Sequence, residues 1–147
     1  KKLIIKFIIL NEDEKYYTNG IPPKIDQIVV EMLKNAYESY DDLEDDIEKE
    51  ILISIEKKNG FIKIEISDKG CGIPADVQSK IYNPFFTTKD RGHSKGLGLT
   101  NIYYNMKEFK GNILLKNSSS KNGTVFKLYF PSYHSNVSSA IPAAKSA

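Results

Sequence analysis

Hydrophobic and polar residues repeat along this chain with two different periods, and these periods predict its secondary structure. Leu3–Leu10 is almost entirely apolar and rich in β-branched residues, which predicts a strand. Between Ile25 and Tyr40 the apolar residues recur at helical spacing, and Asp26 is expected in the first turn of that helix. The apolar stripe of this helix consists of Ile25, Ile28, Val29, Met32, Leu33, Ala36 and Tyr40.

Two hairpins follow from the alternation of apolar and polar residues later in the chain. Ile51–Glu56 and Phe61–Ser67 are joined through Asn59-Gly60, a dipeptide that favours a tight hairpin turn. In the second of these strands isoleucines alternate with polar residues, so we expect one buried face. Asn112–Lys116 and Thr124–Phe130 predict a second hairpin.

The remaining segments complete an α+β order of elements. Ala75–Tyr82, after Pro74, predicts a short helix, and Leu97–Phe109 predicts a longer one. Strand, helix, hairpin, helix, helix and hairpin in this order predict a two-layer sandwich, with a mixed, mostly antiparallel sheet covered on one face by helices. A chain of 147 residues suits one domain, expected over residues 1–131; residues 132–147, rich in serine and alanine, are expected to be a disordered tail.

Composition narrows the function classes. The formal net charge is only +2, so the chain has no strong electrostatic footprint for nucleic acid. The apolar run before Asn11 is short and broken by Lys6, unlike a signal peptide, and no run is long enough to span a bilayer. A single cysteine, Cys71, excludes an internal disulfide and suits a reducing compartment, so we expect a cytoplasmic domain without direct membrane contact.

Polar residues on the first predicted helix form one face. Glu31, Asn35 and Glu38 fall at i, i+4 and i+7, which places them on the same side. A carboxylate and an amide oxygen so placed can hold Mg²⁺ and orient a nucleophile, since Mg²⁺ prefers oxygen ligands and retains several waters. A solvated helix face is the alternative interpretation of this pattern.

Asp68 ends an alternating strand and is followed by Gly70 and Gly72. A carboxylate at a strand end can accept a hydrogen bond from an amino group such as that of adenine. Glycines without a Cβ let the backbone come close to a flat base. A tight turn after a strand is the alternative interpretation.

A second pair of glycines, Gly96 and Gly98, opens the last predicted helix. The segment before it is rich in hydrogen-bond donors and cations, namely Thr87, Thr88, Lys89, Arg91, His93, Ser94 and Lys95. Backbone amides at a helix N-terminus favour bound anions. Neither the Walker A nor the Rossmann glycine pattern occurs. The three motifs in this order predict a nucleotide pocket.

Together the motifs resemble the ATP-binding domain shared by sensor histidine kinases, DNA gyrase B, MutL and the large heat-shock chaperone, the GHKL superfamily with its Bergerat-type fold. The resemblance covers roughly Ile25 to Pro131. Its Phe-Phe-Thr-Thr-Lys and Gly-Leu-Gly-Leu stretches favour histidine kinases of the nitrogen-regulation type. The matching stretches are Glu31-x-x-x-Asn35-Ala36, Asp68-x-Gly70-x-Gly72-Ile73-Pro74, Ile81–Lys89, Gly96-Leu97-Gly98-Leu99 and Gly123-Thr124-Val125-Phe126.

The resemblance implies a role for each matching position. ATP binds with Mg²⁺, Asn35 coordinates the metal, and Asp68 binds the adenine amino group. Many histidine kinases carry asparagine where Glu31 stands, and its catalytic role, orienting or deprotonating the attacking group, is expected from its place on the helix face. Residues from Thr87 to Lys95 form a mobile lid over the phosphates. The other implied nucleotide-binding residues are Gly70, Gly72, Ile73, Thr88, Lys89, Arg91, Lys95, Gly96, Leu97, Gly98, Leu99 and Thr124.

On this resemblance the chain is expected to be the ATP-binding catalytic domain of a two-component sensor histidine kinase. It would donate the γ-phosphate of MgATP to a histidine on a separate helical domain, upstream of a response regulator. Its histidines, His93 and His134, do not lie on a predicted helical hairpin, so the acceptor domain is expected outside this sequence. A GHKL-type ATPase, an anti-sigma-type serine kinase and a degenerate nucleotide-binding module are the alternatives.

Overall fold

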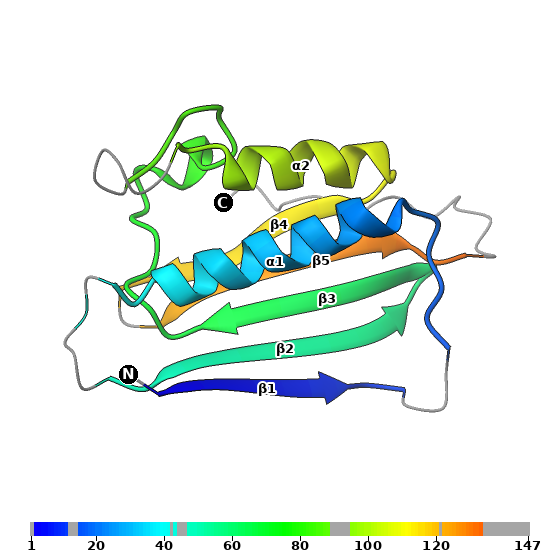
Figure 1. The fold of residues 1–147 in the computed structure, drawn as a ribbon, viewed down its shortest axis with the longest axis horizontal. Helices are drawn as coiled ribbons and strands as arrows, with labels where there is room; N and C mark the ends of the chain where they lie inside the picture. The colour runs from blue at the N-terminus through cyan, green and yellow to red at the C-terminus, as the bar shows by residue number, and fades with distance from the viewer. Residues whose placement is uncertain are drawn as a thin grey trace.

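One face of a five-stranded sheet carries both helices of this protein (Figure 1). The computed structural model describes residues 2–11, 15–41, 43, 47–88, 95–120 and 122–133. The strands run in the order β1-β2-β3-β5-β4, with β1 and β2 parallel and the other neighbours antiparallel. The predicted α+β sandwich is therefore confirmed. The strands are β1 (Leu3–Ile9), β2 (Lys49–Lys58), β3 (Phe61–Asp68), β4 (Asn112–Ser119) and β5 (Gly123–Pro131), and the helices are α1 (Pro22–Glu38) and α2 (Gly98–Glu108).

The predicted hairpin between β2 and β3 forms because its turn residues accept positive φ angles. Asn59 has a φ of 52° and Gly60 a φ of 78°, as a two-residue turn with the twist of paired strands requires. The resulting register pairs Ile53 with Ile66 and Ile55 with Ile64. These isoleucines then share the face that the helices cover.

The core lies between that face and the apolar stripes of the two helices. Ile28, Met32 and Ala36 of α1 are buried there, as the helical spacing predicted. From the sheet and α2 the buried members include Ile51, Ile53, Ile62, Ile66, Ile102, Met106, Ile113, Phe126, Leu128 and Phe130. No helix in the described ranges is long and apolar enough to cross a membrane.

Two local expectations were wrong. Helix α1 begins at Pro22, whose fixed φ suits a first helical position, so no acidic residue lies in its first turn and Asp26 comes later. The segment Ala75–Tyr82 forms only a short 3₁₀ helix over Gln78–Lys80. So short a segment forms few backbone hydrogen bonds. The side-chain amide of Gln78 donates a further hydrogen bond to Ile73 O, 2.9 Å away.

The described fold continues two residues past the boundary expected at Pro131. Ser132 is buried, bridges to Thr18, and its N–H donates to Gly60 O at 2.9 Å. The Tyr133 N–H donates to Tyr17 O. Residues 134–147, the rest of the expected tail, lie outside the described residues.

Tyr40 fixes the end of α1 to the sheet. Its side chain is only 1% exposed. Its hydroxyl donates to Glu50 O at 2.7 Å and accepts from the Lys69 N–H at 2.8 Å. One phenol therefore joins the helix, strand β2 and the turn that follows β3.

We expect Tyr40→Phe to lower the free energy of unfolding by about 1–3 kcal/mol, because the Lys69 N–H and the Glu50 carbonyl lose a buried partner. Tyr17→Phe, at a side chain that is 56% exposed, is the matched control and should change stability little. Urea denaturation measures both. Equal stability of Tyr40→Phe and the native chain would show that the hydroxyl contributes nothing to the fold.

Candidate functional site

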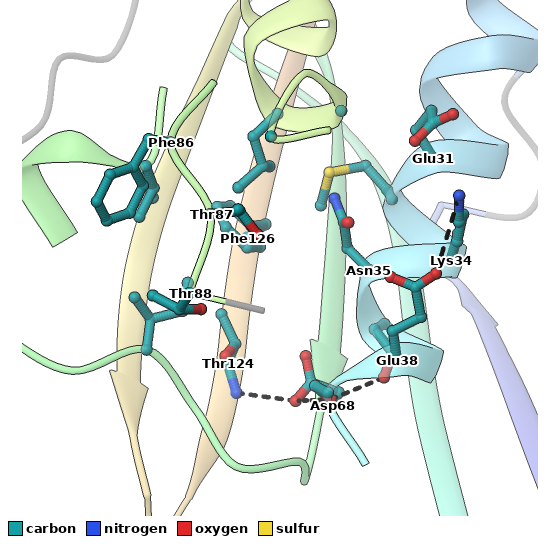
Figure 2. Close-up of a pocket in the computed structure, with 18 of the residues that line it drawn as sticks. Glu31, Lys34, Asn35, Glu38, Asp68, Phe86, Thr87, Thr88, Thr124 and Phe126 are labelled. Atoms are coloured by element: carbon teal, nitrogen blue, oxygen red, sulfur yellow. Dashed lines mark hydrogen bonds and ion pairs between the residues drawn. The ribbon is translucent and has the colours of Figure 1, made fainter. Parts of the chain in front are cut away.

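A cavity of about 780 Å³ lies between α1, the start of α2 and the sheet (Figure 2). Helix α1 supplies Glu31 and Asn35, the end of β3 supplies Asp68, and β5 supplies Thr124 and Phe126. Residues 86–88 and 95–99 are also part of the lining. This volume is typical of small-molecule sites.

Asp68 is held by three hydrogen bonds to one carboxylate oxygen. Oδ1 accepts from the Gly70 N–H at 2.9 Å, the Thr124 N–H at 3.2 Å and the Ser39 hydroxyl at 3.2 Å. The residue is only 5% exposed. Figure 2 shows the other oxygen directed into the cavity, and no described residue donates a hydrogen bond to it. The orientation of the carboxylate is thus fixed with one acceptor left for a ligand.

Burial raises the pKa of Asp68 above its ordinary value, while the hydrogen bonds from Gly70, Ser39 and Thr124 lower it. A raised pKa in the folded state means that folding favours the neutral form of this side chain. The group therefore contributes more favourably to folding as the pH falls through its raised pKa. Hydrogen-bonding to a donor on a ligand would stabilise the charged form and so oppose that shift.

Thr124 belongs to a second network beside Asp68. Its hydroxyl lies 3.0 Å from Ser118 Oγ, which also accepts from the Ile73 N–H at 2.7 Å. This network connects β4, β5 and the chain after the glycine motif. It holds Thr124 and Ile73, both predicted site residues, against the cavity.

Asn35 presents an unsatisfied amide. Its Nδ2 is buried and has no hydrogen-bond partner among the described residues. A buried N–H without a partner is unfavourable, so this atom is available for a hydrogen bond to a ligand. Rotating the amide by half a turn would present the oxygen at the same place. Asn35 can therefore donate to an anion or offer an oxygen ligand to a cation.

The start of α2 faces Asn35 and Glu31. A Cβ built on Gly98 would lie 3.1 Å from Glu31 Oε2 and 3.9 Å from Asn35 Oδ1. The N-cap residue of α2, Leu97, makes no side-chain capping hydrogen bond. The first amides of this helix are thus not satisfied by a side-chain cap, as an anion site at a helix N-terminus requires.

The glycines after Asp68 act differently from what the sequence suggested. Gly70 and Gly72 do not line the cavity. A Cβ on Gly70 would lie 1.9 Å from Ser39 Oγ, and one on Gly72 would lie 2.4 Å from Ser119 O. Gly72 also has a φ of +72°. These glycines are needed where the chain packs on itself, and their expected approach to a base stays a prediction.

Most of the predicted site residues do come together. Lys89 and Arg91 lie outside the described residues, as does most of the expected lid. The predicted residues that line the cavity are Glu31, Asn35, Asp68, Ile73, Thr88, Lys95, Gly96, Leu97, Gly98, Leu99 and Thr124.

The sequence analysis did not select several lining residues, among them Lys34, Ser39 and Phe126. Lys34 lies three residues after Glu31, so helical spacing could have placed it on that side of α1. Phe126 alternates with Thr124 along β5, and both point to the helix-covered face. Nothing local marks Ser39 as a partner of Asp68, because the two are 29 residues apart.

The described residues contain no cluster of three or more histidine, cysteine, aspartate or glutamate side chains that could hold a metal. The groups at the α2 end that could bind a metal ion are the Asn35 amide oxygen and the Glu31 carboxylate. This set fits a cation that takes few protein ligands and is otherwise held by phosphate and water, as Mg²⁺ usually is. A site for a transition metal would need a fuller set of side chains.

Known proteins with similar sequences include ATPases and sensor kinases. Residues 20–134 match the family model described as histidine kinase-, DNA gyrase B-, and HSP90-like ATPase. Sporulation kinase A of Bacillus subtilis is 32% identical over 120 residues, 82% of this chain and 18% of its own length. Sensor kinase CckA of Brucella abortus is 45% identical over 71 residues, 48% of this chain and 7% of its own. The chain thus spans less than a fifth of either relative.

The fold matches solved structures over most of the chain. The catalytic domain of histidine kinase ThkA, in a nucleotide-free form, superposes with a TM-score of 0.71 at 28% identity. The match covers 88% of this chain and 78% of that domain. The five-stranded sheet and its two covering helices are therefore those of a histidine kinase catalytic domain.

We expect Asp68→Ala to lower the free energy of unfolding by about 1–3 kcal/mol for each buried donor that loses the Asp68 carboxylate as its partner. Asp68→Asn keeps an oxygen for all three donors and should stay within about 1 kcal/mol of the native chain. Thermal denaturation without ligand measures both variants. An Asp68→Ala protein as stable as the native one would contradict the structural role of this carboxylate.

Proposed function

The chain belongs to the family of histidine kinase-, DNA gyrase B- and HSP90-like ATPases, and we propose that it works as the catalytic domain of a sensor histidine kinase. In this role it binds ATP with Mg²⁺ and transfers the γ-phosphate to a histidine on a separate helical domain. A response regulator then receives the phosphate, and the domain works in the cytoplasm. The sensor-kinase relatives and the likeness to a histidine kinase catalytic domain support the proposal.

The fixed carboxylate of Asp68 carries the proposal. Its free oxygen is an acceptor at one closed end of the cavity. Adenine presents an exocyclic amino group, which is a donor, whereas guanine presents a carbonyl at the corresponding position. A buried acceptor left opposite a second acceptor is costly, so this end selects adenine.

The phosphates belong at the other end, where α1 and α2 meet. Glu31 lies eight residues before Ser39, which is roughly 12 Å along the helix axis, so the two ends of the cavity are well separated. The first turn of α2 offers amides to the phosphates, and Asn35 offers its amide. When bound, Mg²⁺ would neutralise charge on the phosphates, with Asn35 as its protein ligand.

Glu31 is the described carboxylate next to this phosphate end. We propose that Glu31 orients the attacking group and accepts its proton. A histidine attacks as a neutral nitrogen, so a nearby carboxylate can hold the ring N–H on its other side and stabilise the positive charge that develops. Phosphoryl transfer otherwise depends mainly on positioning and charge neutralisation.

Glu31 also supports one rival function. A carboxylate beside the phosphates could activate water, as an ATPase of the same family would require. The two functions differ in the acceptor: a histidine on a helical domain, or water. Acid-labile phosphate on a supplied helical domain supports the kinase, whereas release of inorganic phosphate at the same rate without that domain supports the ATPase.

We expect Asp68→Asn to weaken ATP binding by roughly ten- to a hundredfold and to reduce the preference for ATP over GTP. The three donors hold the amide oxygen at the Oδ1 position, so the amide nitrogen faces the adenine amino group and two donors oppose each other. Calorimetric titration with ATP and GTP measures this. Asp76→Asn, at an exposed acid outside the cavity, is the control. Equal affinity of the native chain for ATP and GTP would contradict adenine selection by Asp68.

We expect Glu31→Gln to slow phosphate transfer by roughly a hundredfold or more while ATP affinity changes little, because the carboxylate acts mainly in the transition state. The assay joins this domain with the helical histidine domain of the same kinase. Asn35→Ala is the comparison variant and should lose ATP affinity as well as transfer. An unchanged transfer rate in Glu31→Gln would leave Glu31 as a solvated helix residue.

A further inference from the structure

The described lining of the cavity holds more acidic than basic side chains. Its described lining holds four carboxylates, on Glu31, Glu38, Asp41 and Asp68. The same lining holds two cationic side chains, those of Lys34 and Lys95. A polyphosphate entering this cavity meets repulsion from the carboxylates that solvent only partly screens. Each lysine in the lining is therefore a candidate for neutralising phosphate charge.

Lys34 lies at the phosphate end of the cavity, as this role requires. It is adjacent in sequence to Asn35 and three residues after Glu31, the two side chains at the phosphate end. Its Nζ lies 3.8 Å from Glu38 Oε1, one helical turn further along α1. Lys34 and Glu38 both belong to the lining of the cavity, and Figure 2 shows the ion pair that joins them along α1. The ammonium group is thus held beside the cavity by a residue of the same helix.

The pair is suited to exchange. The Lys34 side chain is 56% exposed and that of Glu38 is 21% exposed, so the ion pair is weak. A lysine carries its charge on a flexible four-carbon stem with three donors. Moving the ammonium group from a single carboxylate to phosphate oxygens, which carry more charge, needs only a change of side-chain rotamers.

We propose that Lys34 is a phosphate-binding residue of this site and that Glu38 positions its ammonium group at the cavity before the nucleotide binds. The inference rests on the proposed function and adds to it a cation on α1 itself. Lys34 then neutralises charge from the side of the nucleotide opposite the first turn of α2. The cationic residues of the 87–95 segment are not required for this contribution.

A second lysine on α1 provides a matched control. Lys24 is also ion-paired with a glutamate, Glu108, but it does not line the cavity. Replacing either lysine with glutamine removes one positive charge and one ion pair, which lies within α1 for Lys34 and joins α1 to α2 for Lys24. Of the two lost charges, that of Lys34 belongs to the lining of the cavity and that of Lys24 does not.

The test is calorimetric titration of the chain with ATP, ADP and adenosine at fixed Mg²⁺ and salt. We expect Lys34→Gln to weaken ATP binding by roughly five- to twentyfold and to leave adenosine binding unchanged, since adenosine has no phosphate. Lys34→Arg should retain most of the ATP affinity because it keeps the charge. Lys24→Gln should bind all three ligands as the native chain does.

The contrary outcomes are distinct. If the native chain binds ATP and Lys34→Gln binds it equally well, Lys34 is a solvated lysine and this inference is overturned alone. A loss of adenosine affinity equal to that for ATP would also overturn it, because the effect would then be structural. If the native chain binds no ATP, the proposed function fails first and this inference fails with it.

Discussion

The convergence of three hydrogen bonds on Asp68 Oδ1 is the constraint on which the rest of the site depends. The donors come from Ser39 at the end of α1, Gly70 in the turn after β3, and Thr124 on β5. These contacts hold helix, turn and sheet together at one end of the cavity. They also fix the plane of the carboxylate, so its second oxygen faces the cavity. The side chain that joins these elements is therefore also the one that we propose for base recognition.

The glycines around Asp68 show how tightly this end is built. A Cβ on Gly123 would lie 2.1 Å from the carbonyl oxygen of Asp68, and Gly123 has a φ of +67°. Gly70 comes equally close to Ser39. A larger residue at either place would separate the elements that donate to Asp68. The glycines thus allow the carboxylate to be held in place.

The two helices line different parts of the cavity. The end of α1 lies beside Asp68, while its middle carries Asn35, Lys34 and Glu31 toward the start of α2. Gly98 has no Cβ, which leaves room for the Glu31 carboxylate and the Asn35 amide. The rise of a single helix thus separates the proposed base end from the proposed phosphate end.

The sequence by itself determined the secondary structure that depends on residues close together in the chain. The helical stripe from Ile28 to Ala36, the hairpin at Asn59-Gly60 and the helix after Gly98 were all predicted correctly, because periodicity and turn chemistry are local. Asp68 and Asn35 could also be selected, since the family resemblance marks their positions.

Only the tertiary structure decided how these pieces act on one another. The hydrogen bonds that hold Asp68 join residues 29 and 56 positions away from it, and no local pattern encodes such distances. The unsatisfied amide of Asn35 and the packing role of Gly70 became visible only when the helix lay on the sheet. Ala75–Tyr82 forms i→i−3 turns and a short 3₁₀ helix in place of the expected α-helix, and the Gln78 side chain joins this segment to β4. Long-range packing determined these features, since it competes with local preference and is stronger where side chains are buried.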